Sequence, residues 1–129
     1  MPQLTPATSL ASSPSRAAVV SKAVINAARL LGLTNTALAT VLGLSEATIS
    51  RLASGTYTLD PTHKSYELAL LLIRLYRGLN ALVGGEDAPV QGWMRSPNLA
   101  LDGIPAERIR TIVGLTDAVA YVDSARARL

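Results

Sequence analysis

Apolar residues recur at helical spacing along most of this chain. Near the start, four of them follow one another at intervals of four, three and four residues, which places them on one side of a helix: Val20, Val24, Ala27 and Leu31. Gly32 is placed to end that helix. No convincing run of strict apolar–polar alternation bounded by turn residues, the pattern of a half-buried strand, is found. The pattern therefore predicts an all-α fold.

Two short helices are predicted to follow, separated by a short break. The first covers about residues 35–41, with Thr34 as its N-cap. Ser45 caps the second helix, and Glu46 lies in its first turn, where the helix dipole favours a negative charge. Gly55 is placed to end this second helix.

A long helix is predicted next, from Asp60 to about Val83. Asp60 and Pro61 suit the cap and the first helical position. The helix is apolar on nearly all sides, so it must be covered on both of them. We therefore expect it to join two parts of the protein or to form an oligomer interface. The pair Gly84–Gly85 then breaks the chain.

The last third of the chain is predicted to form three helices, over residues 86–94, 105–113 and 116–126. Pro105 starts the second of these helices, and Gly114 is expected to end it. In the third helix, the apolar stripe consists of Leu115, Val119 and Val122.

Composition and charge divide the chain. Apolar residues make up 49% of it and Phe is absent, so the core must be aliphatic. Residues 1–15 are rich in Pro, Ser and Thr and are expected to be a disordered tail. Residues 16–83 carry a net charge of +4 and residues 84–129 a net charge of −1. This division favours a DNA-binding domain over 16–83 and a protein-binding domain over 84–129.

Several functional classes find no support in the sequence. Cys is absent and His63 is the only His, so neither a disulfide nor a convincing metal site is expected. No nucleophile–base pair and no phosphate-binding loop can be argued, so we expect no catalytic residue, no cofactor and no enzyme. No apolar run reaches the roughly 18 residues that span a bilayer. We expect a cytoplasmic protein that does not contact a membrane.

The segment 35–54 carries the functional signal. Ala39 is small where two crossed helices would touch, and Gly43 tolerates the positive φ that a tight turn requires. Apolar residues stand on both sides of this turn, with Ile49 six positions after Gly43 and Leu52 three further on. The segment resembles the helix-turn-helix of the Xre/λ-repressor-like family, which implies that the second helix recognises DNA.

On that resemblance, the residues of the second helix that do not face the core are available to DNA. Thr48 and Ser50 can bond base edges or phosphates, Ala47 can contact a thymine methyl, and Arg51 can pair with guanine or phosphate. The candidate DNA contacts are Asn35, Thr36, Ser45, Ala47, Thr48, Ser50, Arg51 and Tyr57. The same pattern also occurs in helical proteins that bind no DNA, where Ser45 is only a cap and Arg51 only a solvated charge.

The segment 93–122 carries a second resemblance. Its pattern of Trp93, Pro97, Asn98, Leu99, Gly103, Pro105 and Gly114 looks like the toxin-binding domain of Xre/MbcA/ParS-type antitoxins. The resemblance covers roughly residues 20–125. It implies a type II antitoxin that neutralises a RES-domain, NAD-degrading toxin by direct binding. It also implies that the chain represses its own operon at operator DNA, as a homodimer or a higher hetero-oligomer with the toxin.

The candidate toxin contacts are Trp93, Arg126, Arg128 and Leu129. Trp93 is most simply a core aromatic packed with Leu99 and Leu101. Arg126, Arg128 and the Leu129 carboxylate are candidates to reach the toxin's pocket through charge-assisted hydrogen bonds. The alternative is a frayed tail whose arginines complement the helix dipole.

Two other functions stay open on the sequence alone. One is a stand-alone helix-turn-helix transcriptional regulator whose C-terminal part only dimerises. The other is a helical adaptor that binds protein and not DNA.

Overall fold

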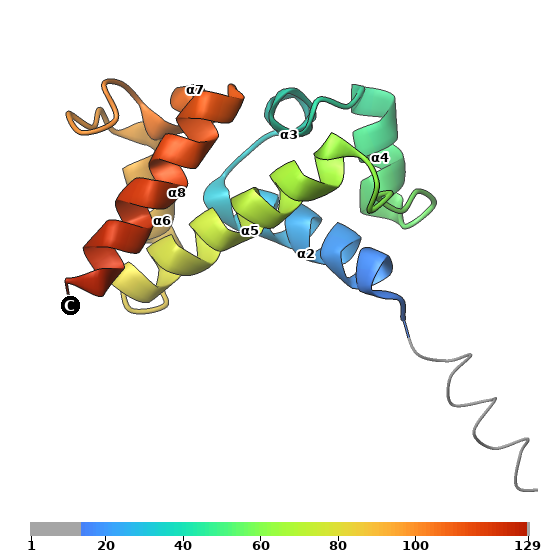
Figure 1. The fold of residues 1–129 in the computed structure, drawn as a ribbon, viewed down its shortest axis with the longest axis horizontal. Coiled ribbons are helices and arrows are strands. Elements are labelled where there is room, and N and C mark those ends of the chain that lie inside the picture. Colours follow the sequence, from blue (N-terminus) through green and yellow to red (C-terminus); the bar gives the residue numbers. More distant parts are fainter. Residues whose placement is uncertain (1–13, 129) are drawn as a thin grey trace, which may run out of the picture.

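The computed structural model describes residues 14–128, and within them it consists of helices and turns without a strand (Figure 1). The all-α prediction is confirmed. The helices are α2 (Arg16–Leu31), α3 (Asn35–Leu42), α4 (Glu46–Ser54), α5 (Lys64–Leu82), α6 (Asp87–Arg95), α7 (Pro105–Arg108) and α8 (Ile112–Ala127).

Local capping explains where α2 begins and ends. The Ser15 hydroxyl accepts a hydrogen bond from the backbone N–H of Ala18 at 3.1 Å, and Gly32 ends the helix in the left-handed region with a φ of 81°. The predicted apolar stripe of this helix is buried. The expected disordered tail over residues 1–15 lies mostly outside the described residues, but Ser15 itself belongs to the helix cap.

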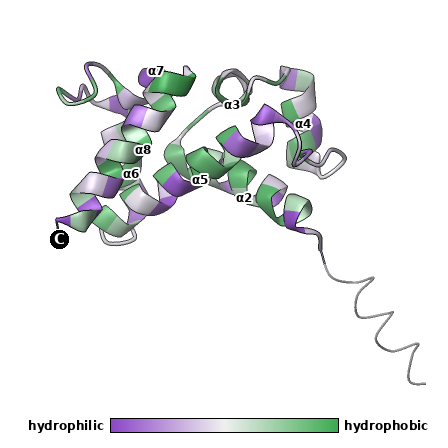
Figure 2. Ribbon diagram, in the orientation of Figure 1, coloured by the Kyte–Doolittle hydropathy of each residue, from purple (hydrophilic) through white to green (hydrophobic). Residues whose placement is uncertain are grey.

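Helix α5 forms the centre of the molecule. It packs against α2 on one side and against α8 on the other, with α3 and α6 adding further cover. Three of its residues have no exposed surface at all: Ala69, Leu72 and Leu75. In Figure 2 apolar residues lie along α5 where α2 crosses it. The expectation that this helix is covered on both sides and joins two parts of the protein is confirmed.

The crossing of α5 and α8 is close because of Gly78. This residue is buried in α5, and a Cβ built on it would lie only 2.5 Å from Cγ1 of Val122 in α8. A side chain at position 78 would therefore push the two helices apart.

The start of α5 differs from the prediction. The helix begins at Lys64, not after Asp60, because Asp60 and the three residues after it form a turn. The Asp60 carbonyl accepts from the N–H of His63 at 3.0 Å. The Asp60 carboxylate accepts from the N–H of Thr62 at 2.9 Å and from its hydroxyl at 2.7 Å. Proline at the second position suits a turn as well as a helix start, so the sequence signal was ambiguous.

The same hydrogen bonds shift the pKa of the Asp60 carboxyl. The hydrogen bonds from Thr62, the backbone bond first, lower the pKa of the Asp60 carboxyl below its ordinary value. The ionised carboxylate is thus the form that the turn favours.

Helix α6 is attached to the rest of the fold by polar contacts and a buried face. Val90 and Met94 are buried, and the side-chain amide of Gln91 donates to the carbonyl of Leu30 at 3.3 Å. The Tyr76 hydroxyl donates to the Asp87 carboxylate at 3.3 Å. Burial, together with this carboxylate, raises the pKa of the Tyr76 phenol.

No single helix among residues 14–128 is both long and apolar enough to cross a membrane. Helices α5 and α6 reach that criterion only when they are counted together, across a bend of 116°.

The break between α7 and α8 also differs from the prediction. Gly114 does not end a helix; it lies inside the first turn of α8, and α7 stops at Arg108. The new helix starts here because the Thr111 hydroxyl caps it, accepting from the N–H of Gly114 at 3.0 Å. Gly114 is required for another reason: a Cβ at this position would lie 1.7 Å from the carbonyl oxygen of Arg108.

The substitution Gly114→Ala is therefore expected to lower the free energy of unfolding by about 2–4 kcal/mol, because backbone atoms of Arg108 must move. Gly92→Ala is the matched control: Gly92 is also helical, and its Cβ would meet no atom within 4 Å. That variant is expected to gain about 0.5–1 kcal/mol from helix propensity. Urea denaturation measures both values, and equal effects of the two substitutions would refute the close approach.

Candidate functional site

A left-handed glycine makes the turn between α3 and α4. Gly43 has a φ of 69°, and the N–H groups of Gly43 and Leu44 both bond the carbonyl of Ala39. Ala39 is buried between the helices, as the motif requires. The predicted position of the bend is confirmed.

The core below the two helices consists of the residues that the motif predicted. Four apolar side chains from both sides of the turn are buried together in the main core: Leu38, Leu42, Ile49 and Leu52. Since Ile49 and Leu52 fill one side of α4, the opposite side of this short helix is left to solvent.

The solvent side of α4 carries most of the predicted DNA contacts. Ala47, Ser50 and Arg51 are exposed, and Thr48 is half-buried beside them. Asn35 and Thr36, at the start of α3, are also exposed, as is Ser45. These residues are therefore accessible to solvent on α4 and at the start of α3.

Hydrogen bonds already connect several of these side chains. The Ser45 hydroxyl accepts from the N–H of Thr48 at 3.1 Å and lies 2.9 Å from the Thr48 hydroxyl. Arg51 donates from Nη2 to the same Thr48 hydroxyl at 3.1 Å. Ser45 and Thr48 therefore hold the Arg51 guanidinium along the surface of the helix, so less side-chain freedom is lost when it binds an anion or a base edge.

An acidic residue lies among these polar groups. The Thr36 hydroxyl donates to the Glu46 carboxylate at 3.0 Å, which links the first turns of α3 and α4. Glu46 is exposed. The carboxylate can accept from a cytosine amino group, but it repels phosphate. It adds a carboxylate to a surface that also carries hydroxyls, the Asn35 amide, the Ala47 methyl and Arg51.

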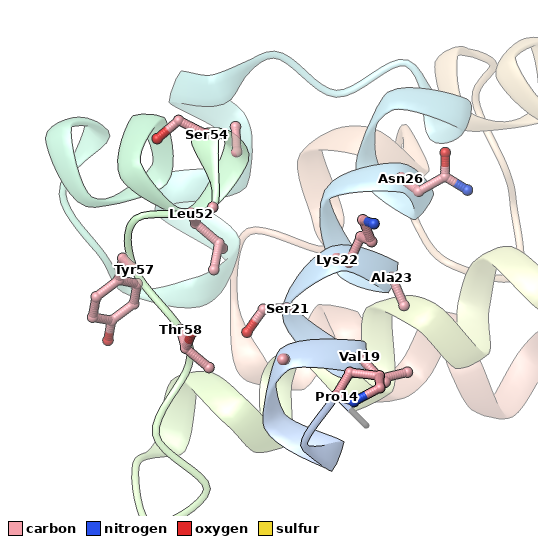
Figure 3. Close-up of a pocket in the computed structure, with 13 residues that line it drawn as sticks. Pro14, Val19, Ser21, Lys22, Ala23, Asn26, Leu52, Ser54, Tyr57 and Thr58 are labelled. Atoms are coloured by element: carbon pink, nitrogen blue, oxygen red, sulfur yellow. The ribbon is translucent and has the colours of Figure 1, made fainter. Parts of the chain in front are cut away.

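The segment after α4 forms an open groove with α2, with a volume of about 770 Å³. Figure 3 shows Tyr57 and Thr58 on one side of it and Val19, Lys22 and Asn26 of α2 on the other. Tyr57, a predicted DNA contact, follows α4 in the chain, is half-buried and lines this groove. Sequence reasoning missed this groove, because its walls come from segments some 30 residues apart.

One buried hydrogen bond determines the position of that segment. The N–H of Leu59 donates to the hydroxyl of Ser21 at 2.9 Å, and both residues are buried. The Ser21 hydroxyl in turn donates to the carbonyl of Ala17 at 2.7 Å. The chain that leaves α4 is thus attached to α2.

In the C-terminal part, Trp93 packs differently from the prediction. Its ring stacks on that of Tyr121, with centroids 6.2 Å apart and planes 26° apart, and so connects α6 to α8. Leu101 is buried, but Leu99 is fully exposed at the tip of a tight loop, so the expected packing of Trp93 with Leu99 is wrong. The loop closes through backbone bonds between Asn98 and Gly103, which point Leu99 outward.

The predicted contacts at the end of the chain are exposed where the structure describes them. Arg126 and Arg128 are solvent-accessible, and Arg128 donates to the hydroxyl of Ser124 at 3.0 Å. Leu129 lies outside the described residues. Ile112 and Val113, at the opposite end of α8, are exposed large apolar side chains that the sequence analysis did not single out.

Comparison with family models covers most of the chain. Residues 11–74 match the antitoxin Xre-like helix-turn-helix domain, and residues 78–128 match the antitoxin Xre/MbcA/ParS C-terminal toxin-binding domain. The chain belongs to the Xre/MbcA/ParS antitoxin family. It is a type II antitoxin with a helix-turn-helix and a toxin-binding domain. A search of curated proteins returns no match.

Within this antitoxin, the matched helix-turn-helix domain contains α2, α3, α4 and the first part of α5, and the matched toxin-binding domain contains α6, α7 and α8. Across residues 14–128, no group of three or more His, Asp or Glu side chains is arranged to hold a metal ion.

The capping of α4 by Ser45 can be tested by measuring the free energy of unfolding. Ser45→Ala removes the acceptor of the Thr48 N–H and is expected to lower the free energy of unfolding by about 1 kcal/mol. Ser50→Ala on the same helix is the control: the residue is exposed, and the change should stay within about 0.5 kcal/mol. Equal values for the two variants in urea titrations would show that Ser45 does not cap α4.

Proposed function

We propose that this antitoxin neutralises a RES-domain, NAD-degrading toxin by direct contact and represses its own operon through the recognition helix. The observation that carries the proposal is the separation of two exposed surfaces by one buried helix. Helix α4 lies near one end of α5, and the C-terminal end of α8 lies near the other (Figure 1). Toxin and operator DNA can therefore occupy different parts of one chain.

The surface of α4 supports the DNA-binding half of the proposal. Its exposed side offers a methyl group at Ala47, a hydroxyl at Ser50 and a positioned guanidinium at Arg51. These groups match thymine methyls, base edges and phosphates or guanine, respectively. A homodimer, or a larger assembly with the toxin, would place two copies of α4 on half-sites about 34–36 Å apart.

The end of α8 supports the toxin-binding half. Arg126 and Arg128 are exposed within the matched toxin-binding domain, and guanidinium groups form strong charge-assisted bonds when a partner desolvates them. In this proposal the DNA-binding part covers residues 16–83 and the toxin-binding part 84–129. The complex acts in the cytoplasm, where both NAD and operator DNA are found.

The DNA half predicts a strong effect of one charge reversal. Arg51→Glu is expected to weaken operator binding by about 10–100-fold, because a base- or phosphate-pairing cation becomes a repelling anion. Fluorescence anisotropy at several salt concentrations measures the affinity. Arg110→Glu reverses another exposed arginine, which lies between α7 and α8, and should bind DNA almost as the wild type does. Unchanged affinity of the Arg51 variant would overturn the role of α4.

The toxin half predicts an effect of shortening the chain. Removal of residues 128–129 leaves α8 complete but deletes Arg128. Growth of cells that co-express the toxin is expected to fall, because the shortened antitoxin no longer fills the toxin's pocket. The Arg51→Glu variant should protect these cells fully, since it retains the whole C-terminal part. Full protection by the shortened chain would refute the contact at the chain end.

A further inference from the structure

A shallow groove lies on the protein surface between α5 and α8, beside the point where the two helices cross closely. Its volume is about 330 Å³, and it is lined by Leu70, Ile73, Arg74, Arg77, Asp123 and Arg126. Four of these residues come from α5 and two from α8. Three of the six are arginines, and only one is acidic.

The charges in this groove are not balanced. Arg74 makes a two-point contact with the Asp123 carboxylate, with Nη2 to Oδ2 at 2.8 Å and Nε to Oδ1 at 3.3 Å. Within residues 14–128, Arg77 and Arg126 form no ion pair. Two guanidinium groups are therefore left for an external anion, next to a third that is already fixed in position.

The close helix crossing positions Arg126. A Cβ built on Gly78 would lie 3.6 Å from Cδ of Arg126, so the aliphatic part of that side chain lies over the glycine in α5. Arg77 is the neighbour of Gly78 along the same helix. This packing supports the aliphatic part of the Arg126 side chain and keeps its guanidinium on the groove side of α8. Arg77 lines the same groove.

An apolar patch adjoins the charges. Leu70 is 38% exposed although it belongs to the central helix, and Ile73 is half-buried beside it. A partner segment with carboxylates and one or two apolar side chains would match this mixture of surfaces.

We propose that the groove binds an acidic segment of the toxin, with its carboxylates paired to Arg77 and Arg126. This inference rests on the proposed function, because it extends the toxin contact from the C-terminal end to α5. The groove is continuous with the matched toxin-binding region, which begins at residue 78. Arg74 is the last residue of the matched helix-turn-helix region and Arg77 lies between the two matched regions, so the groove extends from one matched domain to the other.

Position favours a protein over DNA as the occupant. The groove lies along the part of α5 that α8 covers, whereas α4 lies at the other end of the molecule (Figure 1). The groove therefore lies away from the surface of α4 that is proposed to contact DNA.

The test uses the full-length antitoxin and the RES-domain protein encoded beside it, with affinity measured by biolayer interferometry from low to high salt. Arg77→Glu is expected to weaken toxin binding by about tenfold or more, and mainly by slowing association. The toxin affinity of this variant should fall less steeply with salt concentration than that of the wild type. The toxin affinity of Arg77→Gln should lie between those of the wild type and Arg77→Glu. Arg16→Glu, at the exposed start of α2 in the helix-turn-helix domain, is the control for a general change of net charge, and circular dichroism checks the folding of each variant.

The possible outcomes are distinct. If the wild type does not bind the toxin at all, the proposed function fails. If the wild type binds and Arg77→Glu binds equally well, or if Arg16→Glu loses as much, the groove proposal is overturned. A loss of operator affinity with unchanged toxin affinity would assign the groove to phosphate and also overturn it. Restored binding of Arg77→Glu by a toxin variant with Lys in place of one Asp or Glu would identify the acidic segment.

Discussion

Helix α5 is apolar around most of its circumference, and any side left uncovered would expose leucine side chains to water. In the fold, α2 covers one side of α5 and α8 covers the other. The helix-turn-helix and the toxin-binding domain therefore share one central element. Neither part can bury its apolar surface fully without α5, so the two matched domains form a single core.

This shared helix has consequences for function. Two contacts attach the functional surfaces to it and to α2: the hydrogen bond from Leu59 to Ser21 behind α4, and the close approach of Val122 to Gly78 below α8. Both contacts are buried, so the surfaces of α4 and α8 are held in a defined relation. An assembly that binds DNA through α4 would therefore present the toxin-binding surface in a constant orientation.

The helix-turn-helix could be predicted because its signals are local. Caps at Thr34 and Ser45, a left-handed Gly43 and a small Ala39 determine backbone geometry within a few residues of themselves. The errors arose where one residue pattern fits two local structures. Asp60 with Pro61 suits a turn as well as a helix start, and Gly114 can end a helix or allow a carbonyl to approach. Only contacts with other residues distinguish these cases.

The sequence by itself determined the helical class, the position of the second helix of the helix-turn-helix and its solvent-facing residues, because 3.6-residue periodicity and capping depend on neighbours along the chain. The tertiary structure alone decided the stacking of Trp93 on Tyr121, the exposure of Leu99 and the arginine groove. The exposure of Leu99 follows from the loop that Asn98 and Gly103 close, but the stacking and the groove join residues far apart in the sequence. Their formation depends on how closely helices pack, and in this protein Gly78 sets that distance for α5 and α8.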